Sequence, residues 1–302
     1  MCGIMGYYSF GSIMPNKITI TNMFSLLETR GKDAAGFAFI KDNSIAIHKD
    51  AIKSSEMIKT DEWKILELPR IMILHCRMKT QGTEKNNANN HPLFNKQGLC
   101  IVHNGIIYND KEIFGTKDRD GEVDSEAILA VLSSKQKGDK IKRVFDRLRG
   151  SFAFAAINKQ EPDQLILVKK DNPLGLYYDS GDDILYFCSE REIMLDALNP
   201  KKISKRGFNL GEGNYHYYDL ENNHALVVNS DGVESYKKYR PTVDRDWWME
   251  REISRYSKNR NEMIEIECPY CLSIANYDPA KLLNRCDYCG EILSEEEIGY
   301  VL

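Results

Sequence analysis

The chain opens with MCGIMG at residues 1–6, which places a cysteine directly after the initiator methionine. Removal of Met1 would leave Cys2 with a thiol and a free α-amine on one residue. A thiol with an ordinary pKa of about 8.5 is mostly protonated at neutral pH, whereas an α-amine with a pKa of about 7.7–8 is a suitable base. Cys2 could therefore hold a nucleophile and its base. A lone cysteine near a terminus is more often a small apolar residue, so the rest of the chain decides between the two interpretations.

The bulk composition describes a globular protein. The 302 residues are 42% hydrophobic, enough for one large domain or two unequal ones. Apolar runs such as IMIL (71–74) are far too short to cross a bilayer, and the N-terminus lacks a secretory signal pattern. We therefore expect a cytoplasmic protein with no membrane partner. A net charge of −4 gives no global signature of nucleic-acid binding.

Short β-type runs dominate residues 1–240. GFAFI (36–40) and SIAIH (44–48) flank a polar stretch, which predicts a hairpin with Asp42 and Asn43 in its turn. Further runs of β-branched and aromatic residues are bounded by polar, Gly or Pro residues: RIMILHCRM (70–78), GLCIVHNGII (98–107), SFAFAAIN (151–158), QLILVKK (164–170) and ILYFCSE (184–190).

Helical patterns are fewer and occur in clusters. The segment 20–30 stops at Gly31, and 139–149 stops at Gly150. Residues 124–134 place Ile128, Leu129 and Leu132 on one stripe. This distribution predicts an α+β fold in which sheets are covered by helices.

Five polar motifs adjoin these apolar elements. Each has a simple structural explanation: Asp124 could cap the following helix, and Asn104-Gly105 could form an ordinary turn. The motifs are RGKDAAG (30–36), HCRMKTQG (75–82), NNHP (89–92), HNGIIYN (103–109) and VDSE (123–126).

Taken in this order behind Cys2, the motifs resemble the glutaminase domain of the class II glutamine amidotransferases, which are N-terminal nucleophile hydrolases. The resemblance covers roughly residues 1–200, including LRGSFAFAAI (148–157), KKDNPLG (169–175) and YFCSE (186–190). It is closer to the glutaminases of glucosamine 6-phosphate synthase and phosphoribosylpyrophosphate amidotransferase than to asparagine synthetase. It implies a four-layer αββα fold with Cys2 at the start of the first strand.

The resemblance also implies a role for each matching residue. Cys2 corresponds to the nucleophile, and Asn104 with Gly105 to the oxyanion hole. Arg77 and Thr80 correspond to residues that hold the α-carboxylate of glutamine, and Asp124 to the acid that binds its α-ammonium. Arg30 and Asp33 fall in the motif that shapes the pocket, and His91 is a further substrate-binding position. The zwitterionic end of an amino acid needs a cation and an anion at a fixed separation, which Arg77 and Asp124 would supply. Glutamine is therefore the expected substrate.

The C-terminal residues carry a second pattern. CPYC (268–271) and CDYC (286–289) are separated by 14 residues, a spacing typical of a Cys₄ zinc ribbon. We expect Cys268, Cys271, Cys286 and Cys289 to hold structural Zn²⁺. Residues 266–302 contain seven acidic residues against Lys281 and Arg285, a net charge of −5, which disfavours nucleic-acid binding by this ribbon.

The domain prediction is a glutaminase domain at 1–240, an amphipathic helical linker at 241–265 and a zinc ribbon at 266–302. The sequence has no P-loop, no SGGxDS-type motif and no isomerase-sized domain, so we expect a separate synthetase or ligase chain to accept the ammonia. Two alternatives remain open: an inactive scaffold whose ribbon recruits a partner, and an amidohydrolase for another amide.

Overall fold

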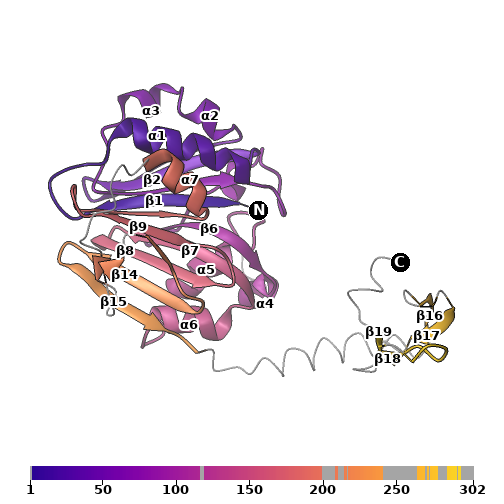
Figure 1. The fold of residues 1–302 in the computed structure, drawn as a ribbon. Helices are drawn as coiled ribbons and strands as arrows, with labels where there is room; N and C mark the ends of the chain where they lie inside the picture. Colours follow the sequence, from indigo (N-terminus) through magenta and orange to yellow (C-terminus); the bar gives the residue numbers. More distant parts are fainter. Residues whose placement is uncertain are drawn as a thin grey trace. The chain divides into compact units, whose positions relative to one another are not determined.

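The computed structural model describes residues 2–115, 119–198 and 217–240, together with the shorter runs 208–209, 214–215, 264–268, 271, 273–277, 284–290 and 292–293. The chain divides into two compact units, Met1–Pro241 and Thr242–Leu302. The first contains two large antiparallel sheets (Figure 1). Within the described residues, no helix has the length and apolar character needed to cross a membrane.

The first sheet has seven strands, and β1 is central. β1 follows Cys2 directly and pairs with β10 on one side and β4 on the other. The strand order is β13 (Tyr217–Asp219), β9 (Gly175–Asp179), β10 (Ile184–Cys188), β1 (Gly3–Ser9), β4 (Ile71–Arg77), β2 (Ala34–Lys41) and β3 (Ser44–Asp50).

The second sheet has six strands, and β6 and β7 form its longest pairing. Its order is β15 (Gly232–Lys238), β14 (His224–Asn229), β8 (Glu161–Lys170), β7 (Gly150–Asn158), β6 (Leu99–Ile107) and β5 (Leu93–Phe94). A further two-stranded pair is formed by β11 (Phe208–Asn209) and β12 (Asn214–Tyr215).

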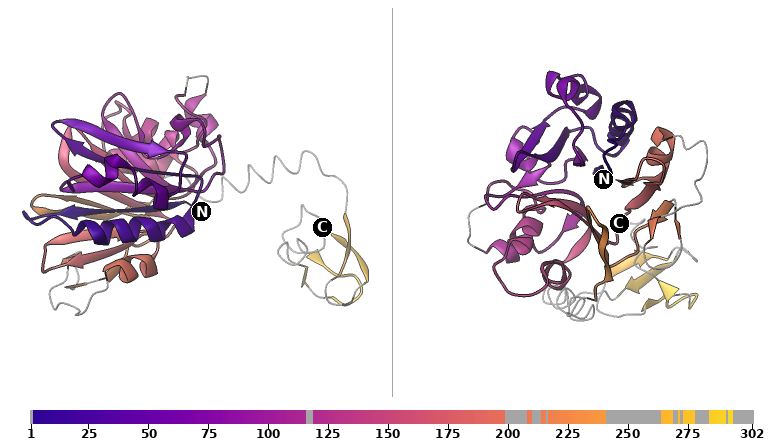
Figure 2. Two further views of the ribbon diagram at one scale, coloured as in Figure 1. Left: turned by 90° about the horizontal axis from the view of Figure 1, so that it is seen from above. Right: turned by 90° about the vertical axis from the view of Figure 1, so that its left-hand side faces the viewer.

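Helices cover the outer face of each sheet (Figures 1 and 2). Over the first sheet lie α1 (Lys17–Leu26), the 3₁₀ turn η1 (Leu27–Arg30), α2 (Ser54–Met57), α3 (Asp61–Ile65) and α7 (Arg191–Leu198). Over the second lie α4 (Asp110–Phe114), α5 (Glu126–Leu132) and α6 (Lys140–Arg147). A second 3₁₀ turn, η2 (Asn87–Asn89), lies in the segment between β4 and β5.

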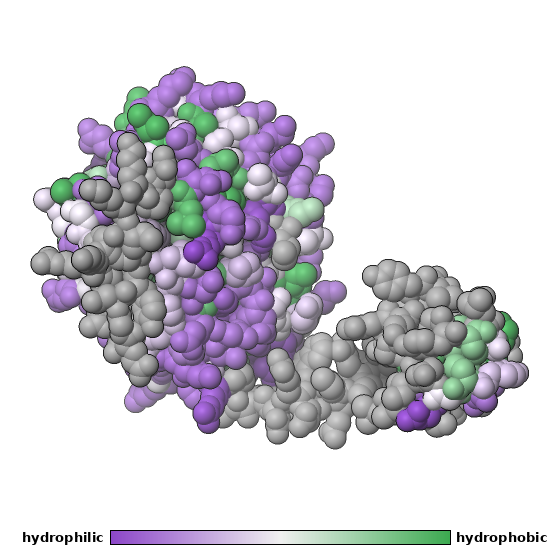
Figure 3. All heavy atoms as spheres, viewed as in Figure 1, coloured by the Kyte–Doolittle hydropathy of each residue, from purple (hydrophilic) through white to green (hydrophobic). Residues whose placement is uncertain are grey.

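The alternation of strand side chains explains these four layers. On β1, Met5 and Tyr7 pack under the first helical layer, whereas Ile4 and Tyr8 face the other sheet. On β6, Ile101 packs under α5 and α6, and its neighbours Cys100 and Val102 enter the inter-sheet core. The predicted αββα arrangement is therefore confirmed. The face of this unit seen in Figure 3 is mostly hydrophilic.

The predicted local elements are largely confirmed. The hairpin β2–β3 turns at Asp42 and Asn43, which both adopt positive φ, as a two-residue type I′ turn requires. Residues 241–263 of the predicted linker, which include Trp247 and Trp248, lie outside the described residues. The end of that prediction is wrong, because residues 264 and 265 belong to strand β16 (Ile264–Glu267).

Candidate active site

Cys2 stands at the head of the central strand. Because Gly3 pairs with Cys76 of β4, the residue before Gly3 lies beside the end of β4. The partly buried Cys2 Sγ lies 3.4 Å from both the amide N and the carbonyl O of Met78. The Arg30 Nε donates to the Cys2 carbonyl oxygen at 3.3 Å. The sheet itself therefore fixes the thiol against the loop that follows β4.

The surroundings of Cys2 do not ionise its thiol. Burial raises the pKa of Cys2, and the Met78 amide and the Arg77 charge only partly offset this, while the Asp124 charge raises it further. The thiol is thus mostly protonated at neutral pH and needs a base to become nucleophilic. Arg77 and Asp124 carry opposite charges and both act on the sulfur.

Arg77 ends β4 and organises the adjoining loop. Its side chain is buried, and Nη1 donates to Asn90 Oδ1 at 2.7 Å. Nη2 donates to the carbonyl oxygens of Gln81 and Gly82, at 2.5 and 3.0 Å. Thr80 lies in the same loop and is exposed. The guanidinium therefore holds the loop that contains Thr80 close to the end of β4.

Asp33 ties the turn after η1 to the same loop. Its amide donates to the Arg77 carbonyl oxygen at 3.0 Å, and its Oδ2 accepts from the Lys79 amide at 2.7 Å. These bonds explain how the RGKDAAG motif shapes the region around Cys2.

Arg30 forms an ion pair that the sequence analysis did not identify. Its Nη1 lies 2.5 Å from Oε1 of Glu190, which follows β10, while its buried Nη2 has no hydrogen-bond partner among the described residues. The pair borders a cavity of about 450 Å³ beside the Cys2 region, lined by Thr29, Arg30, Met78, Glu190 and Ile193. In the sequence, Glu190 is marked only as the last residue of the YFCSE motif (186–190).

Asn104 and Gly105 lie inside β6, opposite Ala153 and Phe152 of β7, so the ordinary-turn interpretation is wrong. Gly105 has φ +146°, and a Cβ there would lie 2.1 Å from the Ser151 carbonyl oxygen, which only glycine avoids. The Asn104 amide is fully buried, yet neither its Oδ1 nor its Nδ2 has a hydrogen-bond partner among the described residues. A buried amide left unpaired costs stability, and such groups occur where a ligand completes them.

Asp124 does not cap α5. Its Oδ2 accepts from the Ile107 amide at the end of β6 at 2.5 Å, and the N-cap position belongs to Ser125, whose side chain makes no capping bond. The helix-cap interpretation of Asp124 is therefore wrong. The carboxylate connects the helix to the strand that carries Asn104.

His91 lies against other histidines. Its ring stacks on His75 with centroids 4.3 Å apart, and its centroid is 6.4 Å from that of His103. Neither ring nitrogen of His91 has a hydrogen-bond partner among the described residues. Burial lowers the pKa of His75 to about 3, that of His91 well below its ordinary value and that of His103 below its ordinary value, so all three rings are neutral near pH 7.

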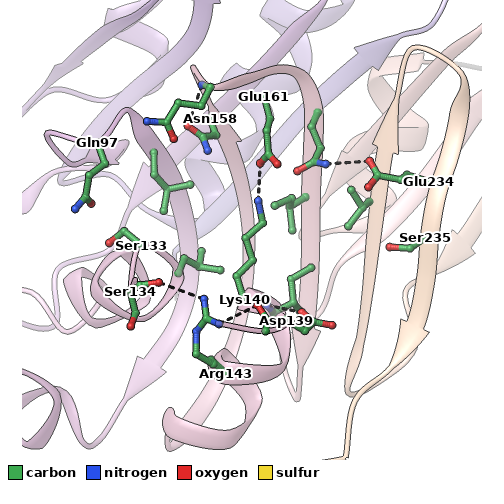
Figure 4. A pocket seen from close by; sticks show the side chains of 18 of the residues that line it. Gln97, Ser133, Ser134, Asp139, Lys140, Arg143, Asn158, Glu161, Glu234 and Ser235 are labelled. Carbon is green, nitrogen blue, oxygen red and sulfur yellow. Dashed lines mark hydrogen bonds and ion pairs between the residues drawn. The ribbon is translucent and has the colours of Figure 1, made fainter. Parts of the chain in front are cut away.

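A larger cavity of about 840 Å³ lies at the other helical layer and does not contain the predicted site (Figure 4). Two of its carboxylates already have partners: Glu161 pairs with Lys140 at 2.5 Å, and Glu234 accepts from Gln164 at 2.9 Å. Volume alone is thus a poor guide to the active site here.

In the second unit the four predicted metal cysteines converge. The described residues of this unit form two strand pairs, β16 with β17 (Ile274–Tyr277), and β18 (Asn284–Arg285) with β19 (Ile292–Leu293). The four Sγ atoms lie within 4.8 Å of one another, with Cys268 to Cys289 at 3.8 Å and Cys271 to Cys286 at 3.7 Å. This cluster can hold a metal ion.

Comparisons with known proteins agree with this geometry. Residues 75–196 match the model of the glutamine amidotransferase domain family. The chain is 33% identical over 194 residues to a glutamine–fructose-6-phosphate aminotransferase of Aquifex aeolicus, covering 61% of this chain and 32% of that protein. The corresponding protein of Pyrococcus horikoshii is 33% identical over 231 residues, covering 70% and 37%. The chain therefore spans about a third of the length of these curated relatives.

Solved structures show the same fold. Glutamine phosphoribosylpyrophosphate amidotransferase from B. subtilis superposes with a TM-score of 0.61 at 19% identity, covering 81% of this chain and 50% of that one. The fold, the order of the motifs and the family match define one class of protein. The chain carries a class II glutamine amidotransferase domain of the N-terminal nucleophile type.

The buried neutral histidines predict a specific loss of stability in acid. In the unfolded chain a histidine binds a proton below a pKa of about 6.5, whereas the folded His91 does not, so the unfolded state binds more protons as pH falls below about 6.5. We expect the Tm to be highest above this pH and to fall from pH 7 to 5. His91→Phe, which removes the titrating group without losing a hydrogen bond, should flatten this fall, whereas His48→Phe at a partly exposed position should not. Differential scanning fluorimetry measures the Tm at each pH. Equal slopes of Tm against pH in wild type and His91→Phe would contradict this assignment.

Proposed function

We propose that this chain hydrolyses glutamine at Cys2 and releases ammonia for transfer to an acceptor. The observation that carries the proposal is the unpaired, buried Asn104 amide beside Gly105, on the strand to which Asp124 is hydrogen-bonded. Such a preformed donor is what an oxyanion requires. The electrostatic effect of Arg77 and Asp124 on the Cys2 thiol further supports a site for a zwitterionic substrate.

In this proposal the substrate is bound through both ends of its amino acid group. Arg77 with Thr80 binds the α-carboxylate of glutamine, and Asp124 binds the α-ammonium. Arg30 and Asp33 support the pocket through their bonds to the Cys2 carbonyl and the Lys79 amide. His91 packs behind this region against His75.

The proposed reaction begins with removal of Met1, which frees the α-amine of Cys2. The amine takes the thiol proton, and the thiolate attacks the side-chain amide carbon of glutamine. Asn104 Nδ2 and the Gly105 amide donate to the resulting oxyanion, each contributing about 3–4 kcal/mol when well placed. The protonated amine then gives its proton to the leaving nitrogen. Ammonia departs, leaving a γ-glutamyl thioester that water hydrolyses to glutamate.

The ammonia acceptor, in this proposal, is a separate synthetase or ligase chain. The relatives named as aminotransferases are about three times as long as the part that this chain matches, which supports an acceptor site outside the glutaminase domain. Four thiolates around a tetrahedral Zn²⁺ at about 2.3 Å have S–S separations of about 3.8 Å, and the measured pairs are at 3.8 and 3.7 Å. We therefore propose a structural Zn²⁺ in a ribbon that docks the acceptor protein.

The glutaminase proposal predicts one decisive pair of variants. Protein lacking Met1 should release equal amounts of ammonia and glutamate from glutamine, because Cys2 then carries both the thiol and a free α-amine. Cys2→Ala should lower kcat by at least about 10³-fold, since the covalent step is lost. Cys100→Ala, which alters a buried thiol of the inter-sheet core, should retain activity within about twofold. An inactive processed wild type, even with its acceptor protein added, would refute the proposal.

Metal analysis tests the ribbon independently. Purified protein should contain one zinc per chain, and Cys286→Ser should lose it because the tetrahedral set is incomplete. Loss of zinc should expose the second unit to limited proteolysis while glutaminase activity stays within about twofold, since Cys2 belongs to the other compact unit. Absence of bound metal, or loss of glutamine hydrolysis together with the zinc, would count against a purely structural ion.

A further inference from the structure

Ser125 and His103 form a buried hydrogen-bond chain that ends on Asp124. The Ser125 Oγ donates to Asp124 Oδ1 at 3.4 Å, and His103 Nδ1 lies 2.8 Å from the same Oγ. His75 Nε2 lies 3.0 Å from the His103 carbonyl oxygen. All four residues are buried. The chain thus connects β4, β6 and the residues just before α5, which carry Arg77, Asn104 and Asp124 respectively.

The chemistry of the partners fixes the direction of each bond. A carbonyl oxygen only accepts, so His75 carries its proton on Nε2. An ionised carboxylate also only accepts, so the single Ser125 proton goes to Asp124 and His103 must donate from Nδ1 to Ser125. Burial lowers the pKa of His103, which keeps this ring a neutral donor at Nδ1. Nε2 is then an acceptor, and it has no hydrogen-bond partner among the described residues.

The hydroxyl of Ser125 is available for this task because it does not cap its helix. Ser125 occupies the N-cap position of α5 without making a side-chain capping bond. A carboxylate rotates easily about its terminal torsion, whereas hydrogen bonds to both oxygens hold its plane. Asp124 receives one such bond from the Ile107 amide and the other from Ser125.

We propose that Ser125 and His103 are positioning residues that set the plane of the Asp124 carboxylate for the α-ammonium of glutamine. His103 orients the Ser125 hydroxyl, and Ser125 orients Asp124. Because His103 directly precedes Asn104, the same chain keeps the ammonium site in register with the oxyanion strand. This inference rests on the proposed role of Asp124 in binding the substrate ammonium.

The test compares glutamine with glutaramate, which has the same side-chain amide and a carboxylate but no α-ammonium. Ser125→Ala should raise the KM for glutamine by about tenfold while kcat, the kcat/KM for glutaramate and the Tm change little. Ser125→Thr, which keeps the hydroxyl, should restore the KM to within about twofold of wild type. Asp124→Asn should raise the KM for glutamine by about 100-fold, again sparing glutaramate.

The outcomes separate this inference from the function on which it rests. If Asp124→Asn raises the KM for glutamine and Ser125→Ala does not, the positioning chain is wrong and the ammonium site stands. If Ser125→Ala weakens both substrates equally and lowers the Tm, Ser125 is only structural and the inference is overturned. If Asp124→Asn leaves the KM for glutamine as little changed as that for glutaramate, the proposed ammonium site itself is wrong. Should Ser125→Ala not fold, His103→Leu against His103→Asn, which retains an N–H donor, makes the same comparison.

Discussion

The pairing of β1 between β4 and β10 is the constraint on which the site depends. It fixes Gly3 opposite Cys76 and so brings Cys2 beside Met78 and the end of β4. A one-residue slip of β1 would turn Ile4 and Tyr8 out of the inter-sheet core and Met5 and Tyr7 into it. The apolar alternation of the strand therefore sets the position of the thiol.

In the proposed reaction, the second sheet contributes the oxyanion donors. Burial raises the pKa of Cys2, so that reaction needs a base and stabilisation of the transition state. The unpaired amide of the fully buried Asn104 costs stability, and the neighbouring Gly105 adopts a positive φ that favours glycine. Such local costs persist where the surrounding sheet enforces them, here through the pairing of β6 with β7.

Sequence reasoning predicted the elements whose signals are local. The β2–β3 turn follows from Asp42 and Asn43, which tolerate positive φ, and the strands follow from their apolar runs. It could not decide whether Asn104-Gly105 was a turn or a strand, because only the long-range pairing with β7 settles that. The Glu190 partner of Arg30 is 160 residues away in the chain, and no periodicity reveals it. The direction of the Asp124 carboxylate likewise depends on Ile107, which belongs to another element.

The proposed reaction requires that the thiol of Cys2 carries the glutamyl group during turnover. Acid quenching of the processed protein within its first turnovers with glutamine, followed by intact-mass and peptide mass spectrometry, tests this most directly. We expect a species heavier by one glutamyl group, located on the N-terminal peptide that contains Cys2 and released by hydroxylamine. Ammonia release from glutamine without any such adduct, or with the adduct on another residue, would contradict it.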